Sequence, residues 1–291
     1  MTKSIVVTGA TGTIGTRVVE GLHAKGAPVV ALVRNADKAA PFAARGVATA
    51  IGTFEDRGSL ERAFAGADTV VLITAANARA GEQALEALGA AKAAGVRKIV
   101  RVSAIKASVD GPTDNTRQHG RTEAAIVASG LTYVTLRPSY FFQNLLASLP
   151  TIQQQGVMYG GVGDGKIAVI DTRDVADAAV VAATSEAFDN QTLELSGPAS
   201  IDHHEIAAAL SRGLGREVKY VAVPPEAVGE AMRAMGLDEW TAGIVRDYAR
   251  AYSQGFGDFT TGHVAALTGH PPRSVDDFVR EVVAGAGSQQ G

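Results

Sequence analysis

A short polar segment, DNTRQHGRTE at residues 114–123, carries side chains whose types and spacing could do chemistry. Asn115, His119 and Glu123 follow at intervals of four, which places them along one face of a helix. An imidazole gains and loses a proton near neutral pH, so His119 could contact a cofactor or relay a proton. The alternatives are that His119 is an ordinary polar residue in a first helical turn and that Glu123 forms structural hydrogen bonds there.

A glycine array stands near the start of the chain, in SIVVTGATGTIG at residues 4–15. Gly9 permits a tight strand-to-helix turn, Gly12 lets backbone approach a pyrophosphate, and Gly15 lets the helix pack closely on the sheet. The helix then directs its N–H groups and positive end at the phosphates. A bare structural turn would also need glycines, but the position between a first strand and a helix favours dinucleotide binding. The intervening residues expected at the cofactor are Thr11, Thr13 and Ile14.

The second strand pattern ends in VRNADK, with Arg34 near the place where an NAD site usually has an acidic residue. Lys38 follows one helical turn later. A guanidinium can pair with a 2′-phosphate through two hydrogen bonds, whereas a carboxylate would repel it. The segment therefore favours NADP(H) over NAD(H). The alternative is a solvated pair of cations at the start of a helix.

Short β-branched segments alternate with alanine-rich helical patterns through the first half of the chain. This alternation predicts an α/β fold with a parallel, doubly wound sheet of Rossmann type. The expected strands are 4–9, 28–34, 48–52, 68–74, 97–103 and 132–138, and the expected helices are 14–25, 36–45, 56–65, 79–94 and 117–129. Later strands are expected at 165–171 and 191–197, returning towards the main sheet.

We expect residues 1–150 to form an NADP(H)-binding Rossmann domain. Residues 151–291 are expected to form a smaller C-terminal α/β lobe on the substrate side, interleaved with the main sheet. The region 220–273 is expected to be a helical cap over the strand ends. The tail GAGSQQG at 285–291 is expected to be disordered.

Composition argues against several classes of protein. The hydrophobic fraction of 46% with only 5% aromatic residues suits buried parallel strands. A net charge of −3 gives no case for a nucleic-acid surface, and the apolar runs are far shorter than the roughly 20 residues that span a bilayer. The chain has no cysteine and its histidines lack a zinc-binding spacing, so no metal site is expected. The first residues enter a strand pattern directly, which favours a cytoplasmic protein without a signal peptide.

Together these segments resemble the atypical short-chain dehydrogenase/reductase family. The resemblance is to its NmrA-like branch, which includes NAD(P)H:quinone reductases and NADP-sensing regulators. It covers nearly the whole length, and it is carried by VTGATGTIG (7–15), VRN (33–35), AAKAAGVRKIVRVSA (90–104), the H-x-x-x-E segment (119–123), SGLTYVTLRPSYFFQN (129–144) and DTRDVADAA (171–179).

The resemblance gives the polar segment a meaning. Typical members use a serine after the fifth strand and a Tyr-x-x-x-Lys motif on the following helix, where tyrosine donates the proton and lysine holds the nicotinamide ribose. Ser103 matches the serine position. Counting back from Ser129 and Gly130 puts His119 at the lysine position and Asn115 at the tyrosine position, with the register better defined at His119. The usual acid is therefore missing.

The resemblance also implies a pocket mouth at RPSYFFQN, beside the nicotinamide. Tyr140 is the nearby phenol that could donate a proton, and Phe141 and Phe142 could stack on a flat substrate; the alternative is that these aromatics belong to the core. The expected catalytic residues are His119, Ser103 and Tyr140. Further expected cofactor contacts are Thr74, Ala75, Ser103, His119, Pro138 and Tyr140, and the expected substrate contacts are Phe141, Phe142 and Asn144.

The leading hypothesis is an NADP(H)-dependent oxidoreductase that reduces a quinone or similar electron-poor small molecule by direct hydride transfer. Losing a general acid costs about 10²–10⁴ in rate, so acceptors that form a stabilised anion suit the missing tyrosine better than simple ketones. The alternatives are a reductase of imines or other specialised metabolites and a non-catalytic NADP(H)-sensing regulator. We expect a flat or aromatic substrate and no nucleic-acid or membrane partner; family analogy alone suggests a homodimer.

Overall fold

The computed structural model describes residues 4–283. Its internal contacts divide the chain into two compact units, which are described separately. The first unit comprises residues up to Gly111, Asn115–Arg137 and Val175–Glu194; the second comprises Pro112–Asp114, Pro138–Asp174 and the residues from Leu195 onward. This division follows contacts and differs from the boundary expected at residue 150. The expected disordered tail lies outside the described residues.

The first unit is built on a seven-stranded sheet with the strand order β3-β2-β1-β4-β5-β6-β8. The strands are β1 (Ser4–Val7), β2 (Val29–Val33), β3 (Ala48–Ile51), β4 (Ala67–Leu72), β5 (Lys98–Val102), β6 (Thr132–Pro138) and β8 (Gln191–Leu195). Neighbours from β3 through β6 pair in parallel. The order of strands reverses beside β1, which confirms the doubly wound, Rossmann-type arrangement.

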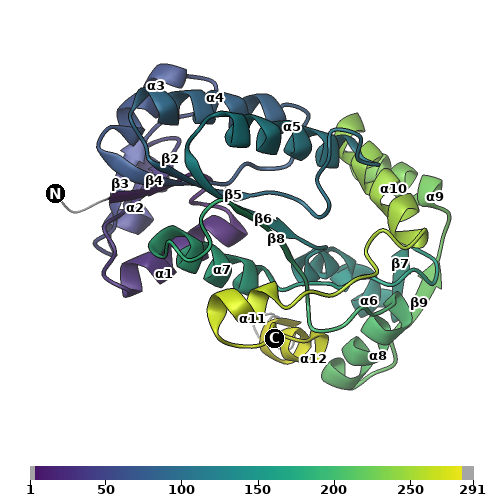
Figure 1. Ribbon diagram of the computed structural model, residues 1–291. Helices are drawn as coiled ribbons and strands as arrows, with labels where there is room; N and C mark the ends of the chain where they lie inside the picture. Colours follow the sequence, from purple (N-terminus) through teal and green to yellow (C-terminus); the bar gives the residue numbers. More distant parts are fainter. Residues whose placement is uncertain (1–3, 284–291) are drawn as a thin grey trace. The chain divides into compact units, whose positions relative to one another are not determined.

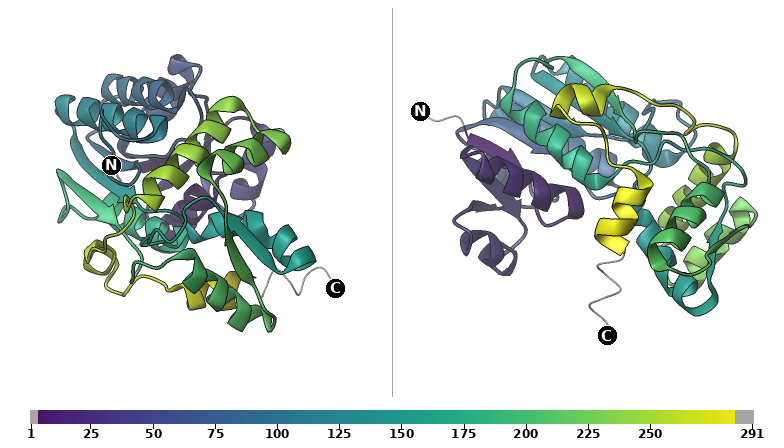
Figure 2. Two further views of the ribbon diagram at one scale, coloured as in Figure 1. Left: turned by 90° about the vertical axis from the view of Figure 1, so that its right-hand side faces the viewer. Right: turned by 90° about the horizontal axis from the view of Figure 1, so that it is seen from below.

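Helices cover both faces of this sheet (Figure 1): α3, α4 and α5 lie on one face, and α1, α2 and α7 lie on the other. Their bounds are α1 (Thr13–Ala24), α2 (Ala36–Ala43), α3 (Arg57–Phe64), α4 (Ala80–Ala93), α5 (Asp114–Ala128) and α7 (Thr172–Thr184). Helices α1 and α7 run side by side (Figure 2), and a Cβ on Gly21 would lie 2.8 Å from a methyl group of Val180. All five helices expected in the first half are therefore present.

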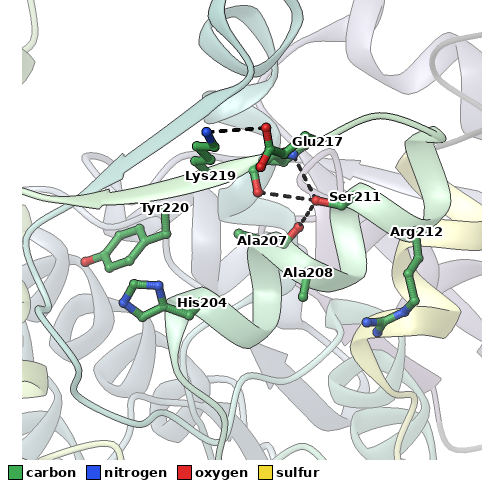
Figure 3. Close-up of a pocket in the computed structure, with 9 residues that line it drawn as sticks. His204, Ala207, Ala208, Ser211, Arg212, Glu217, Lys219 and Tyr220 are labelled. Atoms are coloured by element: carbon green, nitrogen blue, oxygen red, sulfur yellow. Dashed lines mark hydrogen bonds and ion pairs between the residues drawn. The ribbon is translucent and has the colours of Figure 1, made fainter.

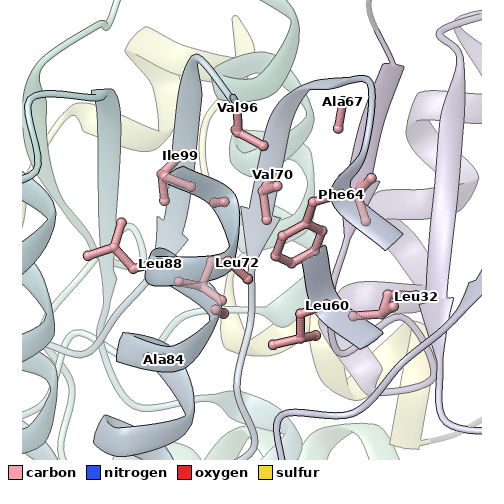
Figure 4. Packing of buried hydrophobic residues seen from close by; sticks show 14 of the residues in the cluster. Leu32, Leu60, Phe64, Ala67, Val70, Leu72, Ala84, Leu88, Val96 and Ile99 are labelled. Atoms are coloured by element: carbon pink, nitrogen blue, oxygen red, sulfur yellow. The ribbon is translucent and has the colours of Figure 1, made fainter. Parts of the chain in front are cut away.

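One layer of the core lies between the sheet and helices α3 and α4 (Figure 4). Leu60 and Phe64 are four residues apart on α3, and both are fully buried. Ala84 on α4 is fully buried as well. Burying a side chain of the size of Leu or Phe stabilises the fold by about 1.5–3 kcal/mol. The four-residue spacing directs the apolar faces of both helices onto the strands.

Helix α5 carries the polar segment 114–123 and packs closely against the rest of its unit. A Cβ at Gly120 would lie 2.3 Å from the carbonyl carbon of Ser108, so the helix approaches that loop more closely than a side chain allows. Gln118 accepts a hydrogen bond from the N–H of Gly81 at 2.7 Å, which fastens α5 to the start of α4. These contacts fix the position of His119.

The second unit contains a two-stranded parallel sheet of β7 (Val157–Gly160) and β9 (Lys219–Ala222). Its helices are η1 (Phe142–Ser148), α6 (Leu149–Gln155), α8 (His203–Leu214), α9 (Pro225–Ala234), α10 (Glu239–Ser253), α11 (His263–Thr268), α12 (Val275–Phe278) and η2 (Val279–Val283). Helix α9 packs against α10, so the region 220–273 is largely helical, as expected. Among the described residues, no helix is both long and apolar enough to cross a membrane.

The prediction of a strand at 165–171 is wrong. Ile167, Val169 and Ile170 are buried like strand residues, but this segment forms only isolated bridges. Its backbone N–H groups bond in turn to the carbonyls of three separate segments, at Ile201, Gly257 and Tyr140. An apolar run of this length indicates burial, and without a continuous partner it forms no ladder.

Candidate cofactor and active site

The turn between β1 and α1 has a shape that glycine alone fits. Gly9 has a φ of +59°, in the left-handed region, and a Cβ there would lie 2.9 Å from the carbonyl oxygen of Ile73. A Cβ on Gly15 would lie 2.1 Å from the carbonyl oxygen of Gly9. Thr8 holds the neighbouring strand end, because its Oγ1 donates to the carbonyl of Ile73 and accepts from the N–H of Ile73, both at 2.8 Å.

The first turn of α1 is open to an anion. Its N-cap residue, Gly12, supplies no capping side chain, and the turn contains no acidic residue. The first N–H groups of a helix lack intrahelical partners and carry positive partial charge. Thr11, Gly12 and Thr13 are exposed and Ile14 is half-buried. These residues therefore fit a pyrophosphate.

Two cations follow β2. Arg34 and Lys38 are exposed, and within residues 4–283 neither forms an ion pair with an acidic side chain. The side chain of Asn35 caps α2 by accepting from the N–H of Lys38 at 3.0 Å, so the chain enters α2 directly beside Arg34. This arrangement leaves both cations available to a 2′-phosphate.

A partly buried charged network lies where β5 and β6 meet α5. The hydroxyl of Ser103 donates to the carboxylate of Glu123. Glu123 also accepts from Arg137, whose Nη2 lies at 2.5 Å, and Arg137 pairs with Glu194 at 3.1 Å. The Ser103 proton is thus held by Glu123. The catalytic role expected for Ser103 and its place beside the nicotinamide stay predictions.

Sequence reasoning missed Arg101, the penultimate residue of β5. Its side chain is 1% exposed, and it donates to the carbonyl of Leu72 at 3.2 Å and to Thr74 Oγ1 at 3.0 Å. Its Nη2 also lies 3.1 Å from Nδ1 of His119. Burial lowers the pKa of Arg101 to about 10. The signal was available in the strand RKIVRVS, because a cation inside a buried parallel strand needs polar partners.

His119 lies on the buried face of α5 and is 9% exposed. Burial, together with the nearby charge of Arg101, lowers the pKa of His119 well below its ordinary value of 6.5. The ring is therefore neutral near pH 7, and we do not retain His119 as an imidazolium acid. Asn115, at the position expected for the missing tyrosine, is half-buried.

In the second unit, the expected aromatic contacts differ in their surroundings. Phe142 is 1% exposed and its ring stacks on Phe278 with centroids 5.4 Å apart, so it belongs to the core and we do not retain it as a substrate contact. The ring of Tyr140 packs edge-on against that of Tyr252, with the ring centroids 5.9 Å apart. Burial raises the pKa of Tyr140 to about 12. Pro138 is buried, Phe141 is half-buried and Asn144 is exposed; their roles stay predictions.

An open groove in the second unit lies along α8 and β9 (Figure 3). Its polar groups already have partners. Ser211 Oγ donates to the carbonyl of Ala207 and accepts from the N–H of Val218, both at 2.8 Å. Lys219 and Glu217 pair with each other at 3.3 Å. We assign no ligand to this groove.

Known proteins resemble the chain over nearly its whole length. The family described as NAD(P)H-binding matches residues 9–186. The chain is 36% identical over 287 residues to NAD(P)H azoreductase of Xenophilus azovorans, with 98% of this chain and 99% of the relative covered. It is 31% identical over 280 residues to quinone oxidoreductase 2 of Escherichia coli (strain K12), with coverages of 94% and 97%.

Solved structures of similar proteins agree with these sequence relatives. The NADPH-dependent quinone oxidoreductase of Escherichia coli in complex with NADPH superposes with a TM-score of 0.89 at 30% identity, covering 96% of this chain and 99% of that one. Triphenylmethane reductase of Citrobacter sp. in complex with NADP(H) has a TM-score of 0.85 at 27% identity, covering 95% and 99%. The chain is thus an NAD(P)H-dependent oxidoreductase and belongs to the NAD(P)H-binding family, in the NmrA-like branch of atypical short-chain dehydrogenases/reductases.

Proposed function

We propose that this oxidoreductase reduces quinones or similarly electron-poor, flat small molecules by direct hydride transfer, without an acid supplied by the protein. The observation that carries the proposal is the state of the groups between β5 and α5. His119 is neutral beside Arg101, and the proton of Ser103 is held by Glu123. Neither group is therefore a strong acid near pH 7.

The first unit supplies the positions that bind the cofactor. The open first turn of α1, at Gly12 and Thr13, would hold the pyrophosphate. Arg34 and Lys38 would hold the 2′-phosphate, and Ala75, in the segment after β4, is exposed and leaves backbone accessible. When bound, NADPH supplies the hydride. The protein contributes the orientation of the acceptor and the electrostatic surroundings of the reacting atoms.

The proton balance favours electron-poor acceptors. Hydride transfer to a simple ketone leaves a strongly basic alkoxide, which needs an acid nearby. Hydride transfer to a quinone leaves a stabilised oxyanion, which can take its proton from water after the transfer. The neutral ring of His119 can still donate a hydrogen bond, and a donor placed at developing negative charge stabilises the transition state.

The named relatives support this choice of substrate. They are an azoreductase, a quinone oxidoreductase and a triphenylmethane reductase, whose names refer to conjugated acceptors. We therefore propose a conjugated small molecule as the substrate. A homodimer and a cytoplasmic location stay predictions, and so does the role of Tyr140.

The rate of NADPH oxidation with a quinone should stay nearly constant between about pH 6 and pH 8. A histidine acid would lose its proton in this range, but the depressed pKa of His119 means that its imidazolium is already absent. The measurement is kcat at saturating NADPH and quinone, corrected for non-enzymatic oxidation. His119→Gln should have an equally flat profile. A wild-type rate that falls above an apparent pKa near 6.5, with the fall lost in His119→Gln, would show that His119 is an acid.

A further inference from the structure

Strand β5 contains two buried cations whose surroundings differ. Lys98 is paired with Asp189, as a buried cation usually is. Arg101 forms no salt bridge within residues 4–283, and its hydrogen bonds go to a carbonyl, a hydroxyl and an imidazole. Glu123 lies close enough to influence Arg101 electrostatically, but its hydrogen bonds go to Ser103 and Arg137. A charge buried without a contacting carboxylate is costly, which argues against a purely structural role.

The hydrogen bonds around His119 determine which ring nitrogen carries the proton. Arg101 can only donate, so Nδ1 of His119 must accept from its Nη2 at 3.1 Å. Ser103 lies 3.3 Å from the same nitrogen, but its proton is committed to Glu123. A neutral imidazole has one N–H, which therefore stands on Nε2.

Nε2 of His119 is available to a bound molecule. This nitrogen makes no hydrogen bond within the described part of the chain. It is also not fully sealed from solvent. The same guanidinium that faces Nδ1 also bonds to Thr74, just beyond the end of β4. Arg101 thus joins α5 to the segment expected beside the cofactor.

We propose that Arg101 is a positioning residue that fixes His119 as the Nε2–H tautomer, so that the ring presents one hydrogen-bond donor to the nicotinamide end of NADPH or to the acceptor. The inference rests on the proposed function for the direction in which this donor acts. The guanidinium also polarises the ring, which strengthens Nε2–H as a donor. Lysine cannot replace it fully, because an ammonium lacks the planar fork that reaches Thr74 and His119 together.

The tautomer of His119 can be measured independently of catalytic turnover. Protein labelled with ¹⁵N-histidine is examined by long-range ¹H–¹⁵N correlation near pH 7, and the His119 signals are assigned from their loss in His119→Gln. We expect Nδ1 without a proton and Nε2 with one in the wild type. Wild-type protein carrying the proton on Nδ1 would overturn the proposal, whether or not any quinone is reduced.

Variants at Arg101 supply the second readout. Arg101→Met should mix the tautomers and raise the pKa of His119, and it should lower kcat with a quinone by about 10- to 100-fold, as is typical when an outer partner that orients an imidazole is lost. Arg101→Lys should restore part of kcat, and KM for NADPH should change little. The exposed-site control Lys92→Met should match the wild type. An unchanged tautomer and kcat in Arg101→Met would overturn the proposal; if this variant does not fold, the wild-type tautomer and Arg101→Lys decide.

Discussion

Gly15→Ala should abolish measurable NADPH binding. The new methyl group would lie 2.1 Å from the carbonyl oxygen of Gly9 and 2.9 Å from Cα of Ala10, so backbone must move. That backbone forms the turn before α1, whose first N–H groups would hold the pyrophosphate. We expect NADPH affinity to fall at least about 100-fold, measured by fluorescence titration. Overpacking should also lower the free energy of unfolding by about 1–3 kcal/mol, measured by denaturant titration.

Gly243→Ala is a matched control for this substitution. Gly243 lies within α10, and outside the helix's own backbone the nearest atom to a Cβ there would be 4.0 Å away, at the end of the Arg246 side chain. Alanine should be tolerated there and should stabilise the helix by up to about 1 kcal/mol, with NADPH binding unchanged. A folded Gly15→Ala protein with wild-type affinity for NADPH would show that the glycine turn does not hold the pyrophosphate.

Arg34→Ala should weaken NADPH binding by about 10- to 100-fold and leave NADH binding nearly unchanged. A hydrogen-bonded pair with a charged group is worth about 1.5–3 kcal/mol, and NADH has no 2′-phosphate to receive it. Arg34 is exposed and forms no ion pair within the described chain, so its loss should not disturb the fold. The measurement is the dissociation constant for each nucleotide.

Two further variants sharpen this result. Lys38→Ala tests the second cation and should have a smaller effect in the same direction, because an ammonium binds phosphate as a point charge. Lys92→Ala removes an exposed cation near the end of α4 and should bind both nucleotides like the wild type. Equal losses of NADPH and NADH affinity in Arg34→Ala would contradict the assignment of the 2′-phosphate site.

The sheet could be predicted because its strands are continuous apolar segments that alternate with helices. Five of the six strands from β1 to β6 lie within their expected ranges, and β4 begins one residue earlier than expected, at Ala67. The same pattern failed at 165–171, where Ile167 and Ile170 are buried but bond to different segments. Burial of a short segment can be inferred from its residues, whereas its hydrogen-bond partners depend on the tertiary fold.

The candidate site was predicted in part. Spacing on a helix indicated that His119 and Glu123 share a face, and both are buried on α5. Arg101 was missed, since sequence spacing does not show that a residue of β5 reaches a ring on α5. The ring's neutrality and tautomer depend on that contact and on burial. Phe142 was expected at the substrate with the core as the alternative, and its burial against Phe278 favours the core.

Oxidation of NADPH by the purified protein against a panel of acceptors tests the central claim most directly. The panel holds quinones, azo and triphenylmethane dyes, cyclic imines and simple ketones, and each rate is measured by nicotinamide absorbance. We expect turnover with the conjugated acceptors and rates about 10²–10⁴ lower with simple ketones, the range that a missing general acid costs. Efficient ketone reduction, or tight NADPH binding without turnover of any acceptor, would contradict the proposed function.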